Sequence, residues 1–119
     1  MKLVQTYALG RLAFGGAALL APATTGRMLS GEGGATPDAQ AFLRGMGGRE
    51  IGLSLGLLRA LREGSPVSSW LAAGVLFDAG DMAGIAGAWP GLAPDKRLPG
   101  FLMAAGAAVF GAALLASPR

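Results

Sequence analysis

The stretch from Leu98 to Pro118 contains no charged side chain, and this feature restricts the possible folds of the chain more than any other. Its large apolar residues stand among many alanines and glycines: Phe101, Leu102, Phe110, Leu114 and Leu115. About 20 apolar residues, each adding about 1.5 Å to a helix, cross the roughly 30 Å hydrocarbon core of a bilayer. The pattern therefore predicts a membrane-spanning helix over residues 98–117.

A second apolar stretch runs from Val67 to Trp89 and contains only two charged residues, Asp78 and Asp81. Trp70 and Trp89 stand near its two ends. Tryptophan prefers the interface between lipid and water, so we expect both side chains to be interfacial anchors. The pattern predicts another spanning helix over residues 67–89.

The first apolar stretch, Leu3 to Ala21, has two interpretations. Lys2, the apolar run and the small residues around Pro22 are features of a cleaved signal peptide. However, Arg11 interrupts the run, and proline between two alanines is unusual at a cleavage site. We therefore favour a retained membrane helix over residues 3–21.

The stretch from Ala41 to Leu61 contains several charges but also a regular series of glycines, Gly48, Gly52 and Gly56. In membranes, small residues at this spacing let helix backbones approach closely. In a soluble helix each glycine would cost about 1 kcal/mol relative to alanine. The alternative explanation is a high glycine background, since the chain has 21 glycines. We expect a packed helix with these three glycines at its interface.

The composition agrees with a bundle embedded in lipid. Charged residues make up 14% of the chain and hydrophobic residues 52%, whereas an average soluble domain has roughly 25% charged residues. The predicted fold class is all-α: one membrane-embedded domain, residues 1–119, with four transmembrane helices at about 3–21, 41–61, 67–89 and 98–117. The segment between the first two helices, residues 24–40, is expected to be a loop with a short surface helix near Gly26 to Leu29.

Several function classes are excluded or disfavoured. The sequence has no cysteine and no histidine, so disulfides, thiolate catalysis and the commonest metal ligands are excluded, and we predict no metal or cofactor. The basic residues are scattered, which argues against nucleic acid. The predicted partners are the lipid bilayer and a homo-oligomer or larger membrane complex. The positive-inside rule favours an N-terminus inside the cell, which places four basic residues inside and three outside: Lys2, Arg59, Arg62 and Arg119 against Arg27, Lys96 and Arg97.

Six ionisable side chains fall at membrane depth in the predicted helices: Arg11, Arg44, Arg49, Glu50, Asp78 and Asp81. Each unpaired charge at a helix centre costs about 2.5–3.5 kcal/mol on insertion scales. We predict that they turn inward and form a buried midplane network, with Arg44 the most able to reach the interface. Such a network either fixes the helix register or marks a ligand, proton or ion site.

Two motifs resemble those of a family of small four-helix bacterial integral membrane proteins of unknown function. They are Arg44-Gly45-Met46-Gly47-Gly48-Arg49-Glu50-Ile51-Gly52-Leu53 and Asp78-Ala79-Gly80-Asp81. In that family an arginine–acid pair precedes a glycine in helix two, and Asp-x-x-Asp follows in helix three. The acid is often aspartate there and is Glu50 here. The resemblance implies the fold and a bacterial cytoplasmic membrane location, and no activity.

Three functions fit these features. The favoured one is a non-catalytic accessory or scaffold protein that acts through helix packing. The second is a small proton- or cation-coupled transporter that uses Glu50, Asp78 or Asp81. The third is an acid-catalysed isomerase or cyclase of a lipophilic substrate, with a carboxylic acid in an apolar cavity as proton donor.

Overall fold

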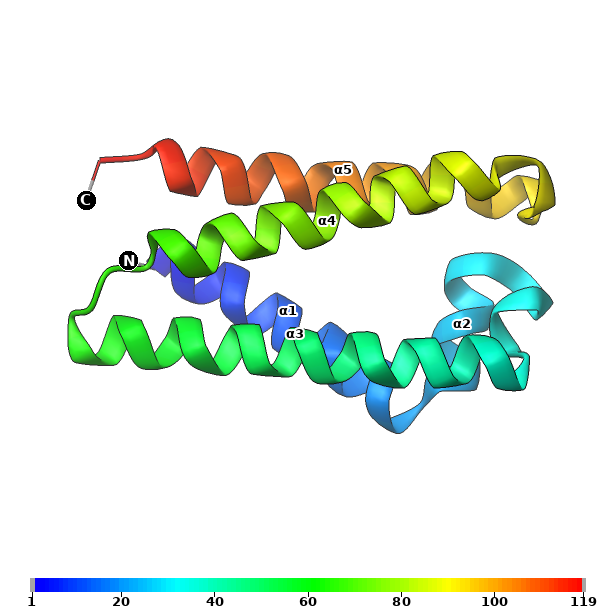
Figure 1. Cartoon of the computed structure of the whole chain (residues 1–119), viewed down its shortest axis with the longest axis horizontal. Helices are drawn as coiled ribbons and strands as arrows, with labels where there is room; N and C mark the ends of the chain where they lie inside the picture. The colour runs from blue at the N-terminus through cyan, green and yellow to red at the C-terminus, as the bar shows by residue number, and fades with distance from the viewer. Residues whose placement is uncertain (1, 119) are drawn as a thin grey trace.

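The computed structural model describes residues 2–118, and within that range all regular structure is helical. The elements in order are α1 (Lys2–Leu20), α2 (Pro22–Ser30), η1 (Gly31–Ala35), α3 (Pro37–Glu63), α4 (Ser68–Ala88), η2 (Trp89–Gly91) and α5 (Pro94–Ala116). The four long helices, α1, α3, α4 and α5, run antiparallel in sequence order in a body about 43 Å long (Figure 1). Both chain ends therefore lie at the same end of the bundle as the turn between α3 and α4.

Helix boundaries follow local start and stop signals. Proline occupies the first position of α2, α3 and α5, where its missing N–H removes no helical hydrogen bond. The Thr36 hydroxyl accepts a hydrogen bond from the Ala39 N–H at 3.2 Å and caps α3. Gly64, with φ of 69°, ends α3 in the left-handed conformation. These signals extend α3 beyond the predicted range of 41–61.

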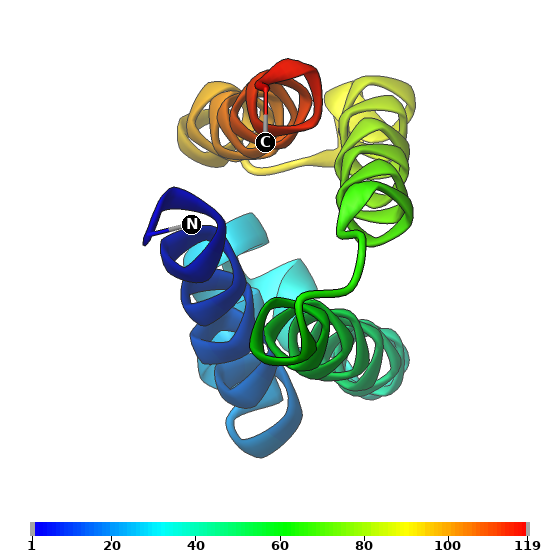
Figure 2. The same cartoon turned by 90° about the vertical axis from the view of Figure 1, so that its left-hand side faces the viewer.

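The long helices form two closely packed pairs, α1 with α3 and α4 with α5 (Figure 2). The first pair meets at two glycines. A Cβ added to Gly47 would lie 2.6 Å from the Gly15 carbonyl oxygen, and one added to Gly15 would lie 2.9 Å from the Gly47 carbonyl oxygen. Only a glycine at each position permits this approach of the two backbones.

The predicted glycine series has a different place in the fold. An added Cβ at Gly48 or Gly52 would meet nothing within 4 Å, so these residues face open space in the single chain. A Cβ at Gly56 would collide with the Trp70 ring, which fills the notch that this glycine leaves. Gly48 and Gly52 point away from α1 because a neighbouring face of α3, the one that carries Gly47, packs against α1.

The segment predicted as a loop, residues 24–40, is mostly helical. It contains most of α2 and all of η1, which lie at the end of the bundle opposite the chain ends (Figure 1). A Cβ at Gly26 or Gly34 would overlap the backbone of the other, so the two elements are in direct contact. This close contact stabilises the helical structure of α2 and η1, which the turn-forming residues of the segment do not predict.

The solid apolar core fills the half of the bundle near the chain ends. It is made of residues from all four long helices and the turn before α4: Val4, Tyr7, Ala8, Leu57, Ala60, Val67, Leu71 and Leu114.

In the described chain, three of the four predicted spans are long and apolar enough to cross a membrane: α1, residues 68–91 and α5. α3 lacks the apolar composition because of its charges. Arg119, which entered the orientation prediction, lies outside the described residues.

Candidate functional site

Arg11 of α1 is the centre of a buried ion-pair cluster. Its Nη1 donates hydrogen bonds to Oδ2 of Asp78 at 2.7 Å and to the Tyr7 hydroxyl at 3.1 Å. Its Nη2 donates to Oε1 of Glu50 at 2.8 Å, and its Nε lies 2.8 Å from Oε2 of the same carboxylate. One guanidinium therefore connects α1 to both α3 and α4.

The cluster is almost fully shielded, since the side chains of Arg11, Glu50 and Asp78 are 8%, 6% and 7% exposed. Burial of charges is costly, and it is offset here because the planar guanidinium engages two carboxylates. Tyr7 adds a second contact, with its ring centroid 5.2 Å from Cζ of Arg11. Arg11, Glu50 and Asp78 therefore meet inside the bundle.

Small residues make room for this cluster. Gly15 and Gly47 bring α1 and α3 together beside Glu50, whose Cβ would lie 2.9 Å from a Cβ added at Gly15. Gly74 leaves space for the Tyr7 hydroxyl, with which any added Cβ would collide. The glycines therefore set the distances between the helices that carry the charged groups.

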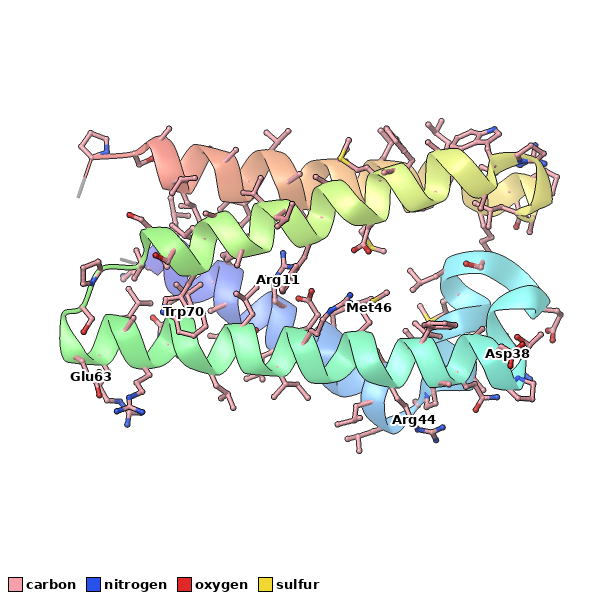
Figure 3. The ribbon with its side chains drawn as sticks, viewed as in Figure 1. Arg11, Asp38, Arg44, Met46, Glu63 and Trp70 are labelled. Carbon is pink, nitrogen blue, oxygen red and sulfur yellow. The ribbon has the colours of Figure 1, made fainter. Side chains whose placement is uncertain are left out.

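The other three predicted members, Asp81, Arg44 and Arg49, make no ion pair with this cluster. Asp81, one turn beyond Asp78 on α4, is half-buried, and it has no ion pair within residues 2–118. Arg49 and Arg44 are exposed, so neither turns inward into the network as predicted, and Arg44 is the one for which the sequence also allowed a place at the interface (Figure 3 shows Arg44 on the outer side of α3). The reason is helical geometry: Glu50 faces Arg11, and Arg49, about 100° away, instead places Cζ 5.4 Å from the Phe77 ring centroid.

A cavity of about 760 Å³ adjoins the cluster and lies between the two helix pairs. Arg11, Glu50, Asp78 and Asp81 line one part of it, and α2, η1 and the start of α5 line the other, where Lys96 contributes its side chain. The walls between are apolar: Phe14, Phe42, Leu43, Met46, Ile85 and Met103. Figure 3 shows Met46 directed from α3 into the space between the pairs.

No family model, curated protein or solved structure matches the chain.

Sequence reasoning missed Tyr7 and Lys96 as site residues, and it included an apolar cavity only in the hypothesis of acid catalysis. Tyr7 had a usable signal, because it stands four residues before Arg11 and so shares its helix face. No sequence signal located Lys96 or the cavity, because both depend on the spacing between the two helix pairs.

Among residues 2–118, no group of three or more acidic residues is arranged to hold a metal ion. Arg11 instead occupies the space between Glu50 and Asp78.

The arrangement has a defined chemical character. Three carboxylates and one guanidinium line the same part of an otherwise apolar cavity, and the guanidinium is shared by Glu50 and Asp78. Asp81 is left as an acidic group that a ligand or a proton can reach. A pocket of this kind suits a molecule with a large apolar part and a polar group directed toward Asp81.

Proposed function

We propose that the chain is an integral membrane protein with four spanning helices, α3 being the fourth. α3 has 27 residues, more than the roughly 20 that a span needs, and it lies antiparallel to α1 and α4. Glu50 is neutralised inside the bundle, Arg49 lies over Phe77, and Arg44 is close enough to one end to extend toward the interface. Trp70 and Trp89, near opposite ends of α4, are proposed as interfacial anchors.

The four-span arrangement predicts a labelling pattern. The chain has no native cysteine, so single cysteines report side-specific access to a membrane-impermeant maleimide. We expect Glu63→Cys and Ser117→Cys to react from one side and Asp38→Cys and Asp95→Cys from the other. We propose that the N-terminus lies on the inner side of a bacterial cytoplasmic membrane, which would place Glu63 on the same, inner side. Labelling of positions 38 and 63 from the same side would mean that α3 does not cross the bilayer.

We further propose that the cavity binds an amphipathic small molecule as the binding step of cation-coupled transport. The observation that carries this proposal is the cavity of about 760 Å³ lined by Asp81, a carboxylate without an ion pair in the described chain. Its volume lies in the range of about 300–1,000 Å³ that is usual for small-molecule sites. Carboxylates inside membrane bundles commonly mark proton or ion paths.

The shape of the bundle supports a carrier. The apolar core closes the end near the chain termini, whereas the cavity extends toward the end formed by α2, η1 and Lys96. The two helix pairs are closely packed internally and meet each other through fewer contacts. Rocking of one pair against the other would open the closed end, as rigid-body rocking does in other carriers.

A matched pair of substitutions tests the cavity. Gly84 lines it and Gly48 does not, and an added Cβ at either position meets nothing within 4 Å. Both leucine variants should fold, since each replaces glycine in a helix with a better helix former. We expect Gly84→Leu, which places a side chain in the cavity, to reduce proton-coupled uptake of amphipathic compounds into proteoliposomes and Gly48→Leu to leave it intact. Equal uptake by both variants would contradict transport through this cavity.

The two remaining hypotheses make different predictions. An accessory role through helix packing is supported by the open face at Gly48 and Gly52, and in that case Gly48→Leu would disrupt an oligomer or complex. Acid catalysis would use Asp81 as proton donor to a lipophilic substrate in the same cavity. In that case the purified protein would convert the substrate in detergent, without a membrane to separate two compartments.

A further inference from the structure

We infer that the ligand of the cavity is a monovalent lipophilic cation, such as a protonated or quaternary amine, with Asp81 as its counter-ion. This inference rests on the proposed function, because it specifies the chemical class of molecule that the cavity takes. It is carried by the balance of charges around the cavity, by the nature of the walls and by the position of Lys96.

The charged end of the cavity has more acidic than basic groups. Glu50, Asp78 and Asp81 line it, and among residues 2–118 Arg11 is the only cationic residue that lines this part. Arg49 lies outside the lining, over the Phe77 ring. Counting Arg49 as well, three ionised carboxylates face two guanidinium groups, which leaves one negative charge. A single positive charge beside Asp81 restores neutrality in surroundings where an unbalanced charge is costly.

The groups next to this end are suited to a soft cation. Phe14, Phe110 and Met46 are among the residues that line the cavity. Aromatic faces attract cations electrostatically, and thioethers are polarisable and adapt to irregular shapes. These side chains can hold the apolar part of a cation without the water that a small inorganic ion requires. The walls thus favour an organic cation over a metal ion.

Lys96 does not cancel this preference because it lines the opposite end. Along α4, the cavity lining extends from Asp81 to Ala88, seven residues or about 10 Å of helix, before it reaches the segment that carries Lys96. Lys96 is close to the first turn of α5, at the same end as α2 and η1. An anion in the cavity would therefore meet Lys96 at one end and three carboxylates at the other.

Two probe ions of nearly identical shape and opposite charge test the inference. Tetraphenylphosphonium and tetraphenylborate are titrated into the protein in nanodiscs of zwitterionic lipid. The same nanodiscs without protein measure the partition of each probe into lipid, and Gly84→Leu protein, whose added side chain occupies part of the cavity, should bind the phosphonium more weakly than the unchanged protein. We expect saturable binding of the phosphonium above the lipid background and none of the borate.

The role of Asp81 is tested in the same assay. Asp81→Asn should weaken phosphonium binding at least about tenfold, Asp81→Glu should retain most of it, and Asp38→Asn, an exposed acid outside the cavity, should retain all of it. Helix content and thermal unfolding of each variant show whether it is folded. Equal binding of the two probes, undiminished binding by Asp81→Asn, or no binding of the phosphonium would overturn the inference. The uptake comparison of Gly84→Leu with Gly48→Leu judges the proposed function independently.

Discussion

Replacement of Arg11 by leucine should destabilise the protein by about 3–5 kcal/mol, because it leaves Glu50 and Asp78 buried without a cationic partner. Leucine fits the apolar surroundings, so the loss would come from the orphaned carboxylates. Arg11→Lys should be intermediate, since an ammonium cannot reproduce the hydrogen bonds to both acids. Reversible unfolding in mixed micelles with increasing SDS measures the free energy directly.

Two controls separate this effect from a general loss of charge. Arg44→Leu removes an exposed arginine from α3 and should change the free energy of unfolding by less than about 0.5 kcal/mol. A triple variant, Arg11→Leu with Glu50→Gln and Asp78→Asn, removes all three charges and should recover part of the stability lost in Arg11→Leu. If Arg11→Leu is as stable as Arg44→Leu, the cluster contributes nothing to the fold.

Substitution of Gly47 by leucine should be strongly destabilising, whereas the same change one residue later should be tolerated. The Cβ at position 47 would lie 2.6 Å from the Gly15 carbonyl oxygen and 2.8 Å from the Leu19 nitrogen, so the backbones of α1 and α3 must separate. Overpacking of this kind typically costs about 1–3 kcal/mol, and more when the backbone must move. The same SDS unfolding measurement applies.

Gly48→Leu is the matched control, because its added Cβ meets nothing within 4 Å. It changes the same residue type on the same helix, and it should be neutral or slightly stabilising in the monomer. Separation of α1 from α3 also moves Glu50 away from Arg11, so we expect Gly47→Leu to impair ligand binding as well as stability. Equal stability of Gly47→Leu and Gly48→Leu would show that the close contact of α1 with α3 is unimportant.

The helices were predictable from the sequence because uncharged stretches such as residues 98–117 leave few alternatives to a membrane helix. The α1 and α4 boundaries lie within a residue of the predicted ranges, 3–21 and 67–89. The extent of α2 was not predictable, since the contact between Gly26 and Gly34 that stabilises it depends on tertiary structure. α5 begins earlier than predicted, at Pro94, because polar residues such as Asp95 also form its first turn.

The sequence could predict that buried charges pair, but only in part which residues form the cluster. The cost of charge in lipid indicates that ionisable groups will pair, but it does not specify which partner each one takes. Glu50 and Arg49 are adjacent, and only the rotation of α3, which the contact between Gly15 and Gly47 determines, places Glu50 inward. The packing face at Gly48, Gly52 and Gly56 stays a prediction for contacts with a partner.

The position of Arg11 has a consequence for how the protein is made. Its two acidic partners stand 39 and 67 residues later in the chain, so neither exists in the membrane when α1 is synthesised. Until then, α1 would enter lipid with a bare guanidinium, at a cost of about 2.5–3.5 kcal/mol. In the proposed four-span arrangement, insertion of α1 should therefore be completed together with that of α3, after Glu50 has been synthesised.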